Sequence, residues 1–156
     1  MSDVLSDRCD SAYRALLESI DGVGDEEAAA FREENWPDHE GRVGEDGSIA
    51  GLVWHCAAWK AMWVTYFDTG VYPEKTALHP AEDTWPGRQA WLTEMHARLM
   101  EHVRRHDGED TSDVYGKPCR MADYDITNGE HDAYHAAQIW YIRQRYAAGR
   151  PGGQFE

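Results

Sequence analysis

The sequence has no apolar run of about 18 residues, so no membrane-spanning helix is expected. It also lacks a basic start followed by an apolar stretch, and we therefore expect no secretory signal. Its three cysteines, Cys9, Cys56 and Cys119, are too few and too far apart for a disulfide framework or a Cys-x-x-Cys metal knuckle. These absences favour a protein of the reducing cytoplasm with no membrane partner.

Basic side chains are scarce, since 15 lysines and arginines stand against 29 acidic residues, for a formal net charge of -14. The imbalance is largest in residues 1–50, which hold 14 acidic and 4 basic residues. Such a surface repels phosphate backbones, so nucleic acid is disfavoured as a partner. An acidic excess of this kind is typical of a well-solvated protein surface.

Several catalytic motifs are missing as well. No glutamate is followed three residues later by a histidine, which argues against the paired Glu-x-x-His motifs of di-iron bundles. The sequence has no His-Glu-x-x-His zinc-protease motif, no glycine-rich phosphate loop and no Gly-x-Ser-x-Gly elbow. The histidines and aromatic residues therefore carry most of the chemical information.

The length of 156 residues suits a single domain with one core, residues 1–156. Helical spacing of apolar residues predicts four helices, together with a short acidic helix over residues 25–34. The four spans are roughly 3–20, 48–69, 84–106 and 127–148. Their connections of about 27, 15 and 20 residues favour an all-α four-helix bundle with long crossover connections. The glycine-rich stretch 41–47 reads as a loop, and residues 149–156 are expected to form a loose tail.

The second predicted helix is apolar nearly all round. Lys60 is its only charged residue before Asp68. A helix of this kind is buried on most faces or contributes to a subunit interface, and it therefore hints at a homodimer. Ser48 is expected to cap its first turn, as Thr84 is for the next helix.

His131 and His135 stand four residues apart on the last predicted helix, so both imidazoles can point at one spot. His55 is a third histidine on an inner face, in the most apolar helix. Three histidine ligands that leave a position open are typical of catalytic rather than structural zinc sites. The alternative for His55 alone is an ordinary hydrogen-bonded core histidine.

Other histidines offer a weaker case for a metal site. His102 and His106 share the four-residue spacing, but a solvated basic helix end explains them well. His39, His79 and His96 fall in predicted loops or on a mixed helical face.

Near the three histidines, Gln138 could orient a ligand, and Trp59 and Trp63 could line a pocket. The alternatives are a hydrogen bond within the core for Gln138 and simple core packing for the two tryptophans. Asp132 and Glu130 read as solvated acids in the first turn of the last helix. Cys56 is expected to point about 100° away from His55 around the helix, which makes it a poor co-ligand. Cys119 lies in a predicted loop and has no assigned role.

The segments "EHDAYHAAQI" and "GLVWHCAAWKAMW" resemble the DinB-like (YfiT-like) superfamily of four-helix bundles. The resemblance covers most of the chain, and its last-helix motif is the more specific. It implies a divalent metal on His55, His131 and His135, with zinc or nickel first and iron or manganese as further options. Many proteins of that superfamily are dimers, and some transfer groups to low-molecular-weight thiols such as bacillithiol or mycothiol.

The leading expectation is therefore a metal-dependent enzyme that acts on a small molecule, by thiol S-transfer. A metal-dependent hydrolase and a non-catalytic metal-binding stress-response protein are the alternatives. An open cation activates bound water and bound thiol alike, so the residues alone do not choose between these reactions.

Overall fold

A computed structural model describes residues 2–30, 47–74, 77–105, 110–112 and 118–149 of the chain. Residues 31–34 of the predicted acidic helix, most of the predicted loop 41–47 and the tail beyond residue 149 lie outside these ranges, as do His39 and His106. The elements are α1 (Ser2–Ile20), α2 (Asp25–Ala29), α3 (Ile49–Thr69), α4 (Trp85–Arg105), β1 (Asp110–Ser112), β2 (Pro118–Arg120) and α5 (Met121–Ala147).

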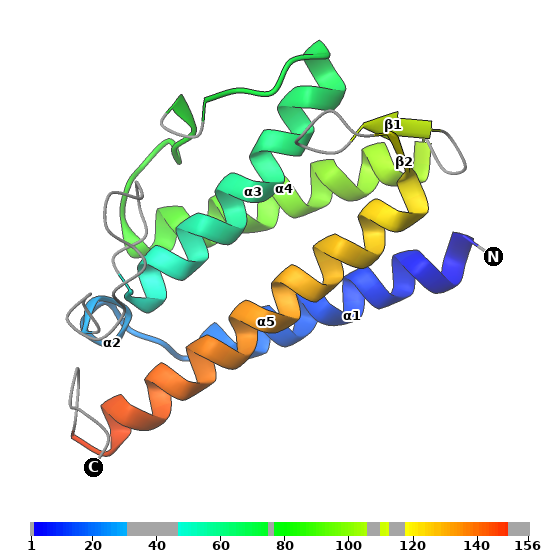
Figure 1. Cartoon of the computed structure of the whole chain (residues 1–156). Coiled ribbons are helices and arrows are strands. Elements are labelled where there is room, and N and C mark those ends of the chain that lie inside the picture. Colours follow the sequence, from blue (N-terminus) through cyan, green and yellow to red (C-terminus); the bar gives the residue numbers. More distant parts are fainter. Residues whose placement is uncertain (1, 31–46, 75–76, 106–109, 113–117, 150–156) are drawn as a thin grey trace.

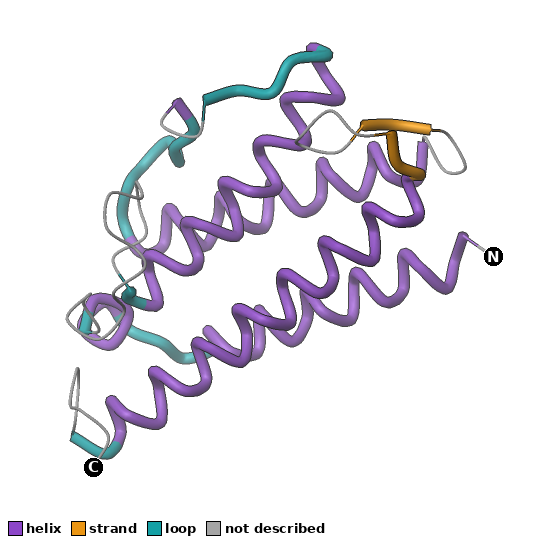
Figure 2. Tube along the Cα trace, in the orientation of Figure 1, coloured by secondary structure: helices purple, strands orange, loops and turns teal. Residues whose placement is uncertain are grey.

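Four long helices are arranged as two pairs, with α1 running beside α5 and α3 beside α4 (Figure 1). The predicted all-α class is confirmed, because the packed core consists of helices. The small ribbon β1–β2 was not predicted; its antiparallel strands place Thr111 opposite Cys119, near the start of α5 (Figure 2). None of the described helices is long and apolar enough to cross a membrane.

Local side chains set the ends of α3 as the sequence predicts. The hydroxyl of Ser48 accepts a hydrogen bond from the backbone N–H of Gly51 at 2.9 Å, which satisfies one donor of the first turn. At the other end, Gly70 has a left-handed φ of 75°, and its N–H donates to the Tyr66 carbonyl at 2.7 Å. The Thr84 hydroxyl likewise accepts from the Gly87 N–H at the start of α4.

Helix α5 begins earlier than the sequence predicted, at Met121 rather than near Thr127. The three residues of β2 lead directly into it, without an intervening loop. The earlier start moves Asp132 from the first helical turn into the middle of the helix. Asp132 is also 0% exposed, so its predicted role as a solvated first-turn acid is wrong.

The core forms where the inner faces of the helices meet. Helix α3 is buried on most of its surface, as its composition predicted. A hydrogen bond of 2.8 Å from the Trp85 indole N–H to the Val23 carbonyl ties the start of α4 to the segment after α1. Among the residues whose burial the structure describes, the buried polar side chains are those of Ser19, Ser48, Lys60, His96, Asp132 and His135. Because burying polar groups without partners is costly, these residues point to the chemistry of the molecule.

Candidate metal centre

Three histidines from two helices meet between α3 and α5. The Nε2 atom of His131 lies 2.9 Å from that of His55 and 3.2 Å from that of His135. One ring nitrogen from each residue lies within 4.8 Å of the other two. Tetrahedral zinc with Zn–N bonds of ~2.0–2.1 Å separates its nitrogen ligands by about 3.3 Å, so the spacings here fit one shared ion. The structure thus brings together the three histidines that the sequence singled out.

Gln138 fixes the orientation of one of these rings. Its side-chain oxygen lies 2.6 Å from Nδ1 of His135, and its amide nitrogen donates to the Tyr134 hydroxyl at 3.0 Å. Because the amide N–H groups point at Tyr134, the amide oxygen accepts the Nδ1–H of His135. That tautomer leaves the lone pair of His135 Nε2 pointing at the other histidines, as metal ligation requires.

Aromatic rings flank the histidines. The ring of Trp59 stacks on His131, with centroids 5.2 Å apart and planes 18° from parallel. The ring of Tyr134 meets His135 edge-on at 5.1 Å and is largely exposed. Trp63 packs elsewhere, in a second apolar cluster that includes Phe67 and Tyr72. Trp59 therefore lies against His131 and also packs on this cluster, whereas Trp63 is buried within the cluster.

Sequence reasoning missed a buried ion pair directly beside the histidines. The Lys60 ammonium lies 2.9 and 2.7 Å from the two carboxylate oxygens of Asp132, and both side chains are 0% exposed. Burial raises the pKa of the Asp132 carboxyl, and the Lys60 charge opposes that shift. The sequence did contain a signal for the burial of Asp132. Asp132 precedes the buried residues Ala136 and Ile139 by four and seven positions, which is the spacing of residues on one face of a helix.

Cys56 also lies closer to this region than expected. Its sulfur, a ring nitrogen of His131 and a carboxylate oxygen of Asp132 all lie within 4.8 Å of one another. Cys56 does point away from His55 on its own helix, but α5 places His131 and Asp132 on that side. The sequence-based view of Cys56 neglected ligands supplied by a different helix.

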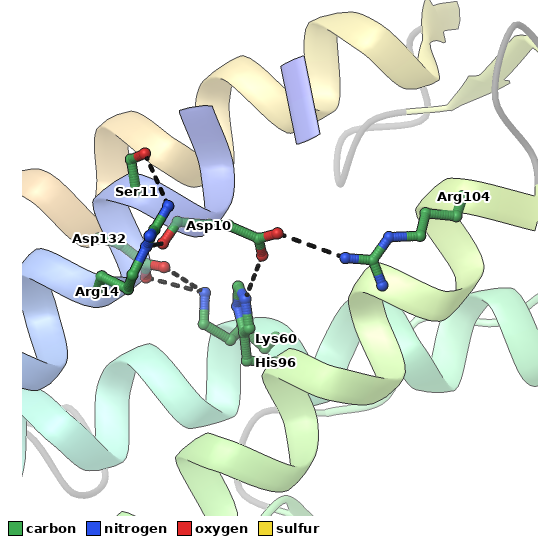
Figure 3. A network of polar contacts seen from close by, with 7 residues as sticks. All are labelled: Asp10, Ser11, Arg14, Lys60, His96, Arg104 and Asp132. Atoms are coloured by element: carbon green, nitrogen blue, oxygen red, sulfur yellow. Dashed lines mark hydrogen bonds and ion pairs between the residues drawn. The ribbon is translucent and has the colours of Figure 1, made fainter. Parts of the chain in front are cut away.

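The remaining described histidines have other partners. His102 Nε2 lies 2.9 Å from the Asp68 carboxylate, and Nδ1 of His79 lies 3.2 Å from the Pro80 carbonyl. His96 Nε2 lies 3.2 Å from Asp10, which also pairs with Arg104 (Figure 3). The His96 ring stacks on Tyr13, with ring centroids 3.5 Å apart.

The environment of His96 predicts acid sensitivity of the fold. Burial and the nearby Lys60 charge lower the pKa of His96 from 6.5 to about 4; Asp10 opposes this shift and Arg104 adds to it. The unfolded chain therefore binds the His96 proton more readily than the folded chain. Stability is fully present above pH 6.5 and is lost as pH falls toward about 4.

We expect this one group to account for a loss of up to about 3 kcal/mol over that range. The measurement is the free energy of urea unfolding as a function of pH. A His96→Phe variant keeps the ring stack on Tyr13 without a titrating group, so its curve should be flatter than that of the wild type. Parallel curves for the two proteins would refute this role of His96.

The geometry brings three imidazoles together, one of them oriented by Gln138, with the buried Lys60–Asp132 ion pair beside them. Comparisons of the chain with protein-family models, with curated proteins and with solved structures find no match.

Proposed function

We propose that this chain is a divalent-metal protein of the DinB-like type, with zinc or nickel on His55, His131 and His135. The supporting observation is the convergence of three Nε2 atoms at spacings that suit one ion. The donor set is chemically appropriate, because neutral imidazoles bind zinc and nickel well. The Gln138–His135 hydrogen bond supports the proposal further, since it orients a ligand before any ion arrives.

We further propose that the chain is an enzyme acting on a small molecule, with transfer to a thiol as the leading reaction. Three neutral ligands leave the full charge on a divalent ion, which would supply Lewis acidity toward a thiol or a water at its open position. The chain's own groups complete the environment. Trp59 covers one face of His131, and Lys60 neutralises the nearest carboxylate.

Two other functions use the same histidines. A metal-dependent hydrolase would place water where the thiol binds. A non-catalytic metal protein is favoured by the position of the ligands on α3 and α5, because an ion there cross-links two long helices. A homodimer belongs to the same proposal, because many proteins of the DinB-like superfamily are dimers, and light scattering of the purified protein tests it directly.

The deciding experiment begins with elemental analysis of protein purified without a nickel column. The proposal expects close to one zinc or nickel ion per chain. Turnover is then assayed with several cellular thiols and an electrophile such as chlorodinitrobenzene or maleylpyruvate. A chain that takes up no ion even after zinc and nickel are added back overturns the metal proposal. Uptake of an ion without turnover of these substrates overturns the thiol-transfer proposal alone.

Gln138 provides a sharper prediction. Replacing it by leucine removes the acceptor for the His135 N–H, so metal affinity should fall by about 10- to 100-fold. Competition against a chromophoric chelator measures the affinity. Gln144→Leu is the matched control, because Gln144 is an exposed glutamine on the same helix. Equal affinities for the two variants would show that Gln138 does not orient the ligand.

A further inference from the structure

A second group of metal-binding side chains lies immediately behind the three histidines. It consists of the Cys56 sulfur, a carboxylate oxygen of Asp132 and a ring nitrogen of His131, all within 4.8 Å of one another. Cys56 and Asp132 are both 0% exposed. A thiol, an imidazole and a carboxylate are the three side-chain types that bind zinc. His131 belongs to both groups, so the two sets of ligands adjoin.

In the structure, a positively charged amino group of the chain itself lies against Asp132 of this second group. The Lys60 ammonium contacts both oxygens of Asp132, at 2.7 and 2.9 Å, with no exposure to solvent (Figure 3). Stability alone does not require this arrangement, because well-packed apolar residues often replace a buried ion pair at no loss. The ammonium supplies the positive charge that a metal ion would otherwise bring to the carboxylate.

We propose that Lys60 closes a second, thiophilic metal site formed by Cys56, His131 and Asp132. With Lys60 in place, Asp132 is neutralised, and an entering divalent ion meets a positive charge. Without Lys60, one carboxylate and one ionisable thiol remain beside His131, a set that suits zinc, cobalt or cadmium. Binding there releases the Cys56 thiol proton to solvent as the sulfur–metal bond forms.

The pairing of Lys60 with Asp132 also affects the charge around an ion on the three histidines. This consequence rests on the proposed function. Asp132 follows His131 directly, and a free carboxylate there would compete for the same ion. Lys60 thus keeps both the carboxylate and the thiol away from an ion on the three histidines. In this role it determines which metal binds and how much positive charge the metal retains.

The test uses cobalt(II), because a cysteine thiolate bound to cobalt produces a strong near-ultraviolet charge-transfer absorption. Wild-type protein should show no such band. Lys60→Met should bind cobalt through Cys56 and should therefore show the band. Adding cobalt should also raise the melting temperature of Lys60→Met more than that of the wild type. Lys60→Met with Cys56→Ser is the matched control, and it should lose the band.

Two further variants make each outcome decisive. Lys60→Gln keeps a hydrogen-bond donor for Asp132 without the charge, and it serves if the methionine variant does not fold. Adding His135→Ala to either variant removes the three-histidine set alone, so a band that persists there locates the ion on the second group. If the wild-type protein binds no metal but the Lys60 variants show the band, the proposed function is overturned and this inference stands. No band in a folded Lys60 variant overturns the inference.

Discussion

Removing either partner of the Lys60–Asp132 pair should destabilise the protein by about 3–5 kcal/mol, because one charge is then left buried without compensation. Both side chains are 0% exposed and their atoms lie within 2.9 Å, so water cannot replace the missing partner without opening the core. The measurement is urea unfolding of Lys60→Ala and Asp132→Ala in the presence of a chelator. The chelator excludes rescue by metal, which would mask the effect.

The paired control replaces both charges together. Lys60→Met with Asp132→Leu fills the same volume with apolar atoms, so its stability should return close to that of the wild type or exceed it. That recovery would show that the cost of each single change comes from the unpaired charge. Single variants that lose less than about 1 kcal/mol would contradict the buried position of the pair.

Loss of metal binding is the second large effect. His131→Ala should lower metal affinity by at least about 100-fold, more than the loss of an orienting neighbour, because a ligand itself is removed. His131 is the most sensitive choice, since its Nε2 atom is the one close to both other histidines. Affinity is measured by chelator competition, and far-ultraviolet circular dichroism reports helical content in parallel.

His102→Ala is the control for this change. His102 is also a histidine on a long helix, but it pairs with Asp68 at 2.9 Å, so metal affinity should stay unchanged. Retained helical content in His131→Ala would indicate a functional rather than a structural ion. Unfolding of that variant would favour the structural role instead. Equal metal affinity of the two variants would place the ion elsewhere.

The helices could largely be predicted from the sequence because the relevant signals are local. Apolar spacing gave the spans of α1, α3 and α4 closely, and Ser48 and Thr84 were identified as helix caps. The start of α5 was predicted too late because Arg120, the residue directly before Met121, is not a preferred capping residue. The four-residue spacing of His131 and His135 was enough to place their rings on one face of a helix.

The geometry of the site was decided by how the helices pack against one another. Lys60 and Asp132 are 72 positions apart, and His96 and Asp10 are 86 positions apart. Sequence spacing fixes the direction of a side chain around its own helix, but not the rotation and height of the opposing helix. The same limit explains Cys56, which was judged by its angle to His55 although its nearest metal-binding neighbours come from α5.

The sequence by itself therefore determined the number and approximate extent of the long helices, the acidic charge and the residues able to bind a metal. Tertiary structure alone decided that three of the histidines in the described part of the chain meet, and that a lysine from the most apolar helix neutralises the carboxylate beside them. The physical reason is that helix formation depends on neighbours within about one turn. A metal site and a buried ion pair depend on atoms brought within bonding distance by packing across the core.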